Sequence, residues 1–393
     1  MSAHGDGGVV LYGRCDEDLG VPYQPWIEAL SPLVAHAPAN LIAAHVSARG
    51  GELARLVPGL AERADVSVPV ASDAVAERYA LFGAITDLLQ RTAAHWPILL
   101  VLDDLHWADK PTVQLMRHLA GVAEGMRLMV IANYRPTDIS ASHPLAEAFS
   151  LLHRFNGVEF VDLAGLDDTE LLDLMEATAG HELDDDGLAL RDAIAAETNG
   201  NAFFATEILR HLAETGAITY RDGRWTATAD LAAQGLPKSI RHVVGERVMR
   251  LGPEAQRLLM IAAVIGRDFE LGLLVEVADA DEADVLDVLD AAVGASLLWN
   301  VGPDRYSFAH ALVEHTLYEE LTPSRVGRLH RRIAIALEAR CGADPGERIG
   351  ELAYHWSTAV VPEDRSKAID YARRAGDRAL VQLAPDEALR WYA

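Results

Sequence analysis

The chain has 393 residues, of which half are hydrophobic and only 6% are aromatic. That length exceeds one ordinary hydrophobic core, so we expect about two to four domains rich in helix. The formal net charge of −25 opposes direct binding to a nucleic-acid backbone.

Composition also excludes several classes of protein. No apolar stretch reaches the roughly 18 residues of a membrane span. The first residues, MSAHGDGG, lack the basic start and apolar core of a secretion signal. We therefore expect a cytoplasmic protein without membrane contact. Cys15 and Cys341 lie far apart with no metal-binding spacing, which predicts two reduced thiols and no structural zinc site.

Four short apolar runs in the first 165 residues have the composition of β-strands. Helical stretches separate them, which predicts an α/β domain at 1–165 with a parallel sheet covered on both faces. The four runs are GVVLYGRC (8–15), WPILLVLDD (96–104), MRLMVIANYR (126–135) and GVEFVDL (157–163).

The next segment, 166–237, has the pattern of a helical domain. Asp167 followed by Glu170 predicts a capping box at the start of its first helix. AITYRDGRWTAT (217–228) predicts a hairpin that turns at Asp222-Gly223.

A third segment, 238–322, combines helices with one ribbon. An apolar stripe along IRHVVGERVMRL (240–251) predicts a helix, and another begins at Pro253, a residue that suits the first helical turn. SLLWNVGPDRYSFAH (296–310) predicts a two-stranded ribbon. Helices followed by a terminal ribbon resemble a winged helix.

The last segment, 323–393, is predicted to be helical throughout from about Val326. AIDYARRAGDRALVQLAPDEALRWYA has the small-residue spacing of a helical-hairpin repeat. One such repeat cannot bury its own hydrophobic face. We therefore expect that the chain ends inside a repeat array.

Six motifs distributed along the chain point to one family. They are GRCDEDLGVPYQPWIEAL, LLVLDDLHWAD, ANYRP, TNGNAFFATEIL, FAHALVEHTLYEEL and ELAYHW. With these motifs the chain resembles the STAND class of AAA-related signalling ATPases. Its resemblance is to bacterial transcriptional regulators with a nucleotide-binding domain, a helical lid, a winged helix and a tetratricopeptide-like arm. It covers essentially the whole chain and implies ATP and Mg²⁺ as cofactors.

The resemblance also assigns roles to residues at the ends of two strands. LLVLDD corresponds to the Walker B strand, so Asp103 would bind Mg²⁺, directly or through water, and Asp104 would orient or deprotonate the attacking water. Arg135, after the next strand, lies where the family places a sensor for the terminal phosphate. From the residues alone, the acidic pair can equally cap a loop or helix, and Arg135 can equally form a surface ion pair. His106 and Trp107 are expected to pack the Walker B loop against the sheet.

The chain departs from the family pattern in its phosphate loop. The family carries GxxxxGK[ST] upstream of GRCDED, but here thirteen residues precede Arg14 and no lysine follows a glycine. That loop supplies several charge-assisted hydrogen bonds of about 1.5–3 kcal/mol each, whereas micromolar binding amounts to about 8 kcal/mol. We therefore expect an N-terminally truncated nucleotide-binding domain with impaired ATP binding. Such a domain would, by analogy with the family, lack its central strand, and its unpaired edges would tend to misfold or to recruit another chain.

A second departure concerns the lid. The stretch GNAFF (200–204) has Ala202 where the family has proline. This difference weakens the implied contact between the lid and adenine.

Three functions remain open from these patterns. The first is a STAND-type ATPase that regulates signalling or transcription by switching its lid and winged helix. The second is a non-catalytic module that binds other polypeptides through its helical arm, and self-association is compatible with it. The third, a DNA-binding factor, is disfavoured because the predicted recognition segment would repel phosphate. Its acidic residues are Glu276, Asp279, Asp281, Glu282 and Asp284.

A metal pair of histidines is not expected. His310 and His315 are five residues apart, which places them on different faces of a helix.

Overall fold

The computed structural model describes residues 7–16, 20–69, 73–221, 224–227, 240–342, 344–359 and 362–393. The chain divides into two compact units, Met1–Phe160 with Cys341–Ala393, and Val161–Arg340. The four-domain division predicted from the sequence stays a prediction. No helix within the described ranges is both long and apolar enough to cross a membrane.

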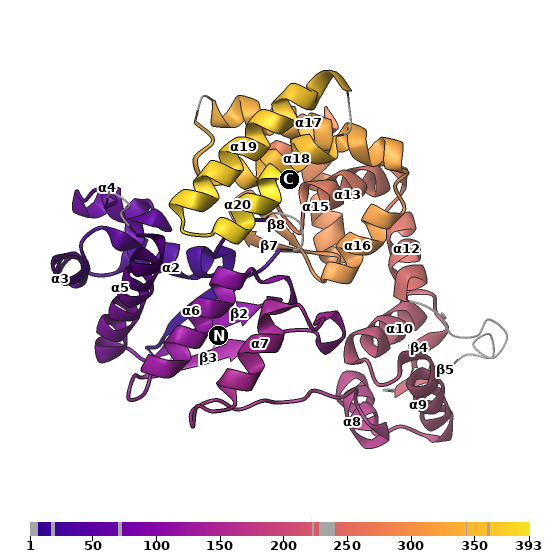
Figure 1. Ribbon diagram of the computed structural model, residues 1–393. Coiled ribbons are helices and arrows are strands. Elements are labelled where there is room, and N and C mark those ends of the chain that lie inside the picture. Colours follow the sequence, from indigo (N-terminus) through magenta and orange to yellow (C-terminus); the bar gives the residue numbers. More distant parts are fainter. Residues whose placement is uncertain are drawn as a thin grey trace. The chain divides into compact units, whose positions relative to one another are not determined.

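The first unit contains a sheet of three parallel strands in the order β1-β2-β3 (Figure 1). Its N-terminal part comprises β1 (Val9–Arg14), α2 (Gln24–His36), α3 (Ala39–Arg49), α4 (Gly59–Ala64), α5 (Ala74–His95), β2 (Ile98–Asp103), α6 (Lys110–Val122), β3 (Leu128–Ala132) and α7 (Pro144–Leu152). Its C-terminal part comprises α18 (Ile349–Thr358), α19 (Arg365–Val381) and α20 (Pro385–Tyr392).

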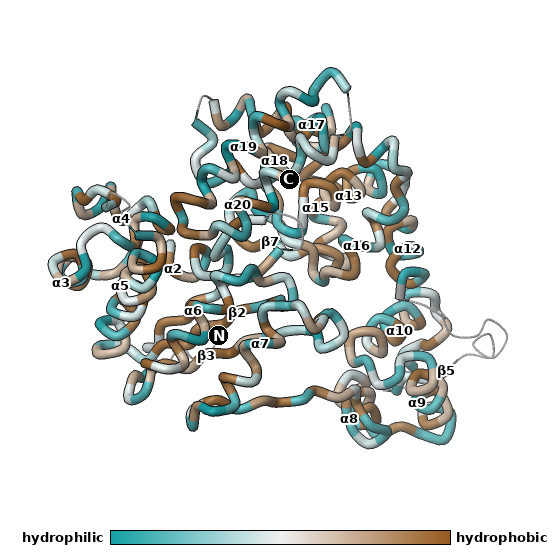
Figure 2. The backbone as a smooth tube through the Cα atoms, viewed as in Figure 1, coloured by the Kyte–Doolittle hydropathy of each residue, from teal (hydrophilic) through white to brown (hydrophobic). Residues whose placement is uncertain are grey.

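The core of this unit lies along the middle strand. Ile98, Leu100 and Leu102 of β2 are buried, and the large side chains of Trp26 and Leu30 in α2 have no exposed surface. Hydrophobic residues follow the strands of this sheet in Figure 2. A strand that is paired on both sides and apolar along its length is expected at the centre of a parallel sheet. The predicted α/β fold with a parallel sheet is confirmed.

The second unit is mostly helical, with two small antiparallel sheets. It comprises α8 (Asp168–Ala179), α9 (Asp185–Thr198), α10 (Ala202–Glu214), β4 (Ile218–Arg221), β5 (Arg224–Ala227), α12 (Ile240–Arg250), α13 (Pro253–Ile265), β6 (Asp268–Glu270), α14 (Leu271–Ala278), α15 (Glu282–Gly294), β7 (Leu298–Gly302), β8 (Arg305–Phe308), α16 (Ala311–Glu319) and most of α17 (Pro323–Cys341). The sheets are β4-β5 and β6-β8-β7.

Several local signals of this unit are confirmed. The Asp167 carboxylate accepts hydrogen bonds at the start of α8 and the Glu170 carboxylate accepts one from the Asp167 amide, which is the predicted capping box. A helix begins at Pro253, and β7 and β8 form the predicted ribbon. β4 and β5 form the predicted hairpin, whose turn at Asp222-Gly223 lies outside the described residues.

Two predictions about the sheet of the first unit are wrong. The run GVEFVDL (157–163) was predicted as a strand from its apolar composition, but it forms none. A strand also needs a neighbouring strand to pair with, and this run has none. The sheet is also not covered evenly on both faces. Successive residues of a strand point to opposite faces, and Val130 and Ile131 of β3 are each 37% exposed.

Gly13 of β1 is a close-packing position against α2. A Cβ atom at Gly13 would overlap the main-chain carbonyl group of Pro25. Overpacking of this kind typically costs about 1–3 kcal/mol, so we expect Gly13→Ala to lower the free energy of unfolding by at least that amount. Denaturant unfolding measures the change. Gly59→Ala is the control because a Cβ there meets nothing within 4 Å, and equal destabilisation of both variants would contradict the packing.

A buried ion pair joins α10 and α12 in the second unit. Arg247 Nη1 lies 2.6 Å from Glu207 Oε2, and each side chain is 4% exposed. Removing one partner of such a pair leaves an uncompensated charge, so Glu207→Gln should cost about 3–5 kcal/mol in denaturant unfolding. The control is Glu254→Gln, which breaks an exposed pair with Arg257 and should cost about 0–1 kcal/mol. Similar losses for both variants would refute this assignment.

Candidate functional site

A polar cluster occupies the carboxyl edge of the three-stranded sheet. The parallel register places Arg14 of β1 opposite Asp103 of β2, and Leu102 opposite Ala132 of β3. The residues that follow each strand therefore meet at one edge, where ligands commonly bind in open α/β sheets. Asp103, Asp104 and Arg135, which were predicted from the sequence, all lie at this edge.

The carboxylate of Asp103 is held by neutral donors from both neighbouring strands. The Tyr12 hydroxyl donates to Oδ2 at 3.0 Å, and the Asn133 side-chain amide donates to Oδ1 at 3.2 Å. The main-chain amide of Asp104 also donates to Oδ1 at 3.2 Å. A carboxylate has about four acceptor positions, so these bonds orient Asp103 and leave it able to bind a cation.

Asp104 has a left-handed backbone conformation, with φ 54° and ψ 39°. Aspartate tolerates this conformation better than most residues. It turns the chain where β2 ends and the short helix Leu105–Trp107 begins. Oδ1 of Asp104 lies 4.0 Å from Nε2 of His106.

His106 is buried beneath this turn. Its ring lies 4.3 Å from the ring of Trp107, and neither of its ring nitrogens has a hydrogen-bond partner within the described residues. Burial lowers the pKa of His106, against the opposing effect of Asp104. Its burial and its ring contact with Trp107 agree with the predicted packing role of His106.

Arg135 lies after β3 and packs on an aromatic ring. Its Cζ atom is 5.7 Å from the ring centroid of Trp107, within the range of a cation–π interaction. This contact fixes the stem of the side chain at the sheet edge. Whether the guanidinium group contacts a phosphate stays a prediction.

The sequence interpretation missed two residues that hold Asp103. Tyr12 lies two residues before the end of β1, and Asn133 directly follows β3 in the motif ANYRP. A signal for Asn133 was available, because polar residues immediately after parallel strands converge on the same edge. Tyr12 had no such signal, since an aromatic residue within a strand is typical of packing.

A second group of polar residues forms a hydrogen-bonded cluster at the end of β1. The main-chain amide of Arg14 donates to Glu28 Oε2 at 2.9 Å, and Nη2 of Arg14 donates to Asp16 Oδ1 at 2.9 Å. The side-chain amide of Gln24 donates to both Asp16 and Glu28. These groups satisfy one another, so they position α2 against β1.

Asp109 caps the helix that follows the cluster. Its Oδ1 accepts from the Thr112 amide at 2.8 Å and its Oδ2 accepts from the Tyr23 amide at 3.1 Å. Burial raises the pKa of Asp109 to about 6, while the hydrogen bonds from Thr112 oppose this shift and the nearby Glu387 carboxylate adds to it. The cap therefore titrates in the weakly acidic range.

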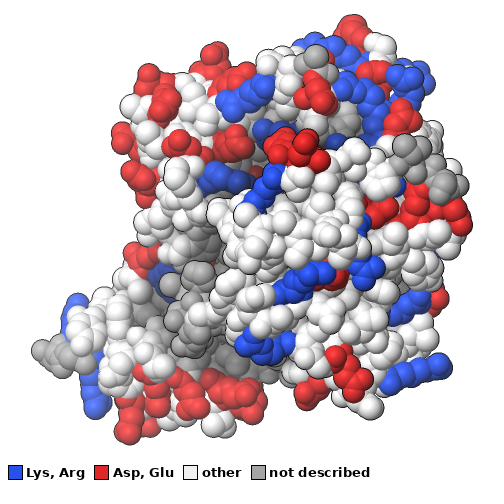
Figure 3. All heavy atoms as spheres, turned by 90° about the vertical axis from the view of Figure 1, so that its left-hand side faces the viewer, with Lys and Arg blue, Asp and Glu red and all other residues white. Residues whose placement is uncertain are grey.

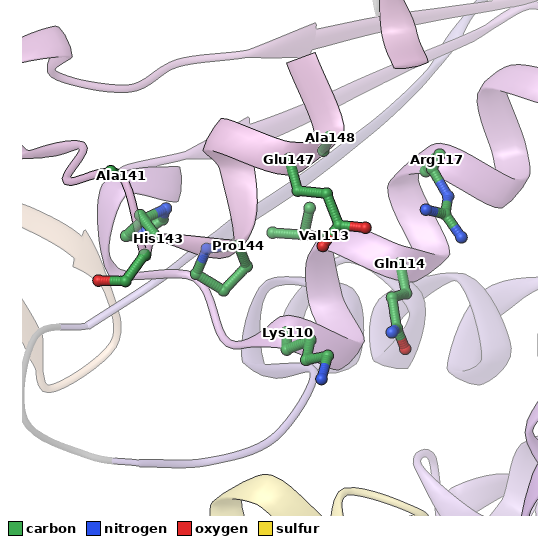
Figure 4. A pocket seen from close by; sticks show the side chains of 10 residues that line it. Lys110, Val113, Gln114, Arg117, Ala141, His143, Pro144, Glu147 and Ala148 are labelled. Carbon is green, nitrogen blue, oxygen red and sulfur yellow. The ribbon is translucent and has the colours of Figure 1, made fainter. Parts of the chain in front are cut away.

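A shallow cavity of about 230 Å³ lies between α6 and α7 (Figure 4). Its lining includes Lys110, Gln114 and Arg117 from α6 and Glu147 from α7, whose side chains are drawn around it. Lys110 is paired with Asp386 at 3.3 Å, and Glu147 adds a negative charge to the lining. This mixture of charges does not form a phosphate cradle.

The described residues contain no group of three or more His, Cys, Asp or Glu side chains arranged to hold a metal ion. Cys15 and Cys341 are free thiols. Magnesium in nucleotide sites is commonly held by one or two carboxylates together with phosphates and waters. The pair Asp103 and Asp104 fits that limited requirement, whereas it does not fit a metal site made entirely of protein ligands.

The comparisons with known proteins agree with this geometry. Residues 1–131 match the family model of the AAA ATPase domain. The crystal structure of a Signal Transduction ATPase with Numerous Domains (STAND) protein with a tetratricopeptide repeat sensor, from Pyrococcus horikoshii, is similar in fold. The TM-score is 0.50 at 12% identity, covering 98% of this chain and 55% of that chain. Residues 1–131 are therefore similar to AAA ATPase domains, and the chain has the fold of a STAND protein.

One curated relative is a signalling protein by its name. The hybrid signal transduction histidine kinase G of Dictyostelium discoideum is 25% identical over 134 residues, which are 33% of this chain and 4% of that protein. The chain thus spans about half of the STAND structure and a small part of the kinase. The resemblance predicted from the sequence, to AAA-related proteins with a STAND-type fold, is confirmed.

The raised pKa of Asp109 predicts a pH-dependent stability. The folded state holds the proton up to about pH 6, whereas the carboxyl group of an unfolded chain loses it near 3.8. This contribution to stability is therefore fully present below about pH 3.8 and is lost as the pH rises through 6. We expect Asp109→Asn, which keeps a good N-cap residue, to flatten the stability profile between these values.

Denaturant unfolding at several pH values measures this slope. The control is Asp184→Asn at the exposed N-cap of α9, which should leave the slope unchanged. An identical slope for Asp109→Asn and the unaltered chain would contradict the buried, protonated cap.

Proposed function

We propose that the chain is a nucleotide-linked signalling protein whose site is the carboxyl edge of its parallel sheet. Asp103 binds Mg²⁺, Asp104 orients or deprotonates the attacking water, and Arg135 contacts the terminal phosphate of ATP. The observation that carries the proposal is the alignment of the strand ends, which places Asp103 and Asp104 after β2 and Arg135 after β3, with the Arg135 guanidinium on the ring of Trp107. The match of residues 1–131 to the AAA ATPase domain supports it.

The arrangement of Asp103 supports a magnesium role. Its side-chain partners Tyr12 and Asn133 are neutral, and with the Asp104 amide they use three of about four acceptor positions, which leaves room for a cation or its water shell. Mg²⁺, when bound, would neutralise phosphate charge and polarise the reacting phosphoryl group. The protein residues would fix its place and orient water at the sheet edge.

The affinity for nucleotide is proposed to be low. The sequence contains no GxxxxGK[ST] motif, and the described cavity between α6 and α7 offers no phosphate cradle. Two carboxylates, one arginine and a bound Mg²⁺ correspond to a few charge-assisted contacts. We therefore place the dissociation constant closer to the millimolar range, about 4 kcal/mol, than to the micromolar range, about 8 kcal/mol.

The second unit supplies the proposed switch. We assign α8–α10 with β4 and β5 to the helical lid, and α12–α16 with the sheet β6-β8-β7 to the winged helix. In this assignment the lid motif GNAFF begins α10, where Asn201 is the N-cap and Ala202 the first helical residue. The boundaries proposed for the four domains are 1–165, 166–237, 238–322 and 323–393.

The proposed role in transcription is indirect. Residues 276–284 of the winged-helix region are rich in carboxylates, which would repel phosphate. On the face drawn in Figure 3, acidic side chains form a band at the lower left, and basic side chains gather mainly at the upper right. We propose that the chain acts on other polypeptides in the cytoplasm and that the winged helix is structural.

A second candidate function is a non-catalytic interaction module. Large hydrophobic side chains of α19 and α20 are exposed, which is typical of a surface that binds protein. They are Ile369, Leu380, Val381, Leu389 and Tyr392. In this alternative the acidic pair Asp103 and Asp104 serves only to end β2 and to turn the chain.

Calorimetric titration of Mg²⁺-ATP into the full chain tests the first proposal. We expect weak binding that Asp103→Asn reduces at least tenfold, because the variant removes the magnesium ligand. Asp104→Asn should leave binding unchanged and abolish phosphate release, because it removes only the group that acts on water.

The control is Asp138→Asn, since Asp138 lies near His106 at the same edge but has no role in the proposal. Binding that survives in Asp103→Asn would contradict the magnesium assignment. Absence of binding at millimolar ATP, from chain shown to be folded by circular dichroism, would favour the interaction module.

A further inference from the structure

Helix α7 contacts both loops that carry the proposed site residues. The ring of Phe149 in α7 lies 4.8 Å from the ring of Tyr134, the residue before Arg135. At the start of the helix, Nε2 of His143 lies 2.9 Å from the main-chain carbonyl oxygen of His106 in the loop after β2. Through these two contacts α7 joins the loop after β2 to the loop after β3.

The other ring nitrogen of His143 caps the same helix. His143 is the N-cap residue of α7, and its Nδ1 atom accepts a hydrogen bond from the Leu145 amide at 3.1 Å. This bond satisfies one of the main-chain amides that have no partner within the helix at its N-terminus. One imidazole ring therefore holds together the start of α7 and the loop after β2.

These two contacts fix the tautomer of the ring, because each partner is a main-chain group with one possible role. The His106 carbonyl oxygen only accepts, so Nε2 of His143 carries a proton. The Leu145 amide only donates, so Nδ1 of His143 has none. A neutral imidazole has one N–H group and one acceptor nitrogen. The arrangement therefore fits the neutral Nε2–H form and fits neither the other tautomer nor the charged ring.

A proton on Nδ1 would place two donors against each other. The charged ring of His143 would direct an N–H group at the Leu145 amide, so the cap of α7 would be lost. Nε2 would still donate to the His106 carbonyl, because it carries a proton in both states. Gain of a proton therefore weakens the contact between the ring and α7 while the contact with the loop remains.

The titratable and charged groups around His143 come from several elements and have mixed signs. They are Lys110 and Arg117 of α6, Glu147 of α7, and His106 with its neighbours Asp104 and Asp138. The first three line the same cavity as His143 (Figure 4). Within the described residues, His143 makes no hydrogen bond to any of these side chains. The two main-chain contacts therefore decide which form of the ring fits.

We infer that His143 is a positioning residue, which in its neutral form couples α7 to the turn at Asp104 and releases α7 when it gains a proton. Its action on the site is indirect, because the ring contacts the main chain two residues after Asp104 and not the carboxylate itself. An effect on ATP turnover rests on the proposed function, whereas the tautomer and the release of α7 do not.

NMR of the full chain with nitrogen-labelled histidine tests the form of the ring. At about pH 8 the long-range proton–nitrogen correlations should show His143 as the Nε2–H tautomer, and absence of its signal in His143→Gln assigns it. At about pH 5 both ring nitrogens should carry protons, because histidine side chains generally change charge between these values. Over the same range the Leu145 amide should lose at least tenfold of its hydrogen-exchange protection, after correction for the intrinsic rate.

Two substitutions separate the two contacts of the ring. Asparagine is a good N-cap residue but is too short to reach the His106 carbonyl, whereas the side-chain amide of glutamine reaches the position of Nε2 and caps poorly. His143→Asn should lower the exchange protection of the Leu105 and Trp107 amides, which bond within and beside the turn, at least tenfold. It should preserve the protection of the Leu145 amide. His143→Gln should have the opposite effect and should respond no further to acid.

Turnover of Mg²⁺-ATP provides a second measurement under the proposed function. His143→Asn should lower phosphate release at least tenfold without changing the affinity for nucleotide, because it moves the turn at Asp104 and leaves Asp103 in place. The control is His153→Asn at the other end of α7, where the ring stacks on Phe160. It should leave turnover and the protection of the turn unchanged. If the unaltered chain releases no phosphate, the proposed function fails, and NMR and exchange alone decide the inference.

Three outcomes would overturn the inference. The first is an Nδ1–H tautomer of His143 at about pH 8. The second is exchange protection of the Leu145 amide that acid leaves unchanged in a folded chain. The third is an equal loss of protection at both places in His143→Asn and His143→Gln, which indicates a purely structural residue. The first two measurements use the unaltered chain, so they decide the inference even if a variant does not fold.

Discussion

The pairing of β2 with a parallel strand on each side is the constraint on which the site depends. Parallel pairing aligns the carboxyl ends of β1, β2 and β3, so the residues after each strand converge without further help from loops. Asp103 can then accept hydrogen bonds from Tyr12 on one side and Asn133 on the other. A shift of one residue in either register would move these donors to the opposite face of the sheet.

Packing near the sheet edge turns this alignment into a fixed geometry. The left-handed turn at Asp104 sends the chain back over the sheet, and buried His106 holds that turn through its contact with Trp107. The same indole supports the guanidinium group of Arg135. One aromatic side chain therefore links the loops after β2 and β3, which explains why the acidic pair and the arginine stay at one edge.

The net charge of the chain and its buried ion pairs have different effects. The net charge of −25 disfavours direct binding to a nucleic-acid backbone. In the interior of the second unit, the buried charges of Glu207 and Arg247 pair between α10 and α12.

The amino-acid sequence by itself determined the three strands of the first sheet and the position of the acidic pair at the end of β2. Strand-forming runs at β1, β2 and β3, the capping box at Asp167 and the start of α13 at Pro253 all depend on neighbouring residues, so local patterns predict them. The prediction of a strand at 157–163 was wrong because a strand needs a neighbouring strand to pair with. Amino-acid composition does not show whether such a neighbour is present. Only the tertiary structure decided that Tyr12 and Asn133 hold Asp103 and that a third strand, β6, joins the ribbon of β7 and β8. Those contacts join residues far apart in the chain, and they follow from the register between strands rather than from any local preference.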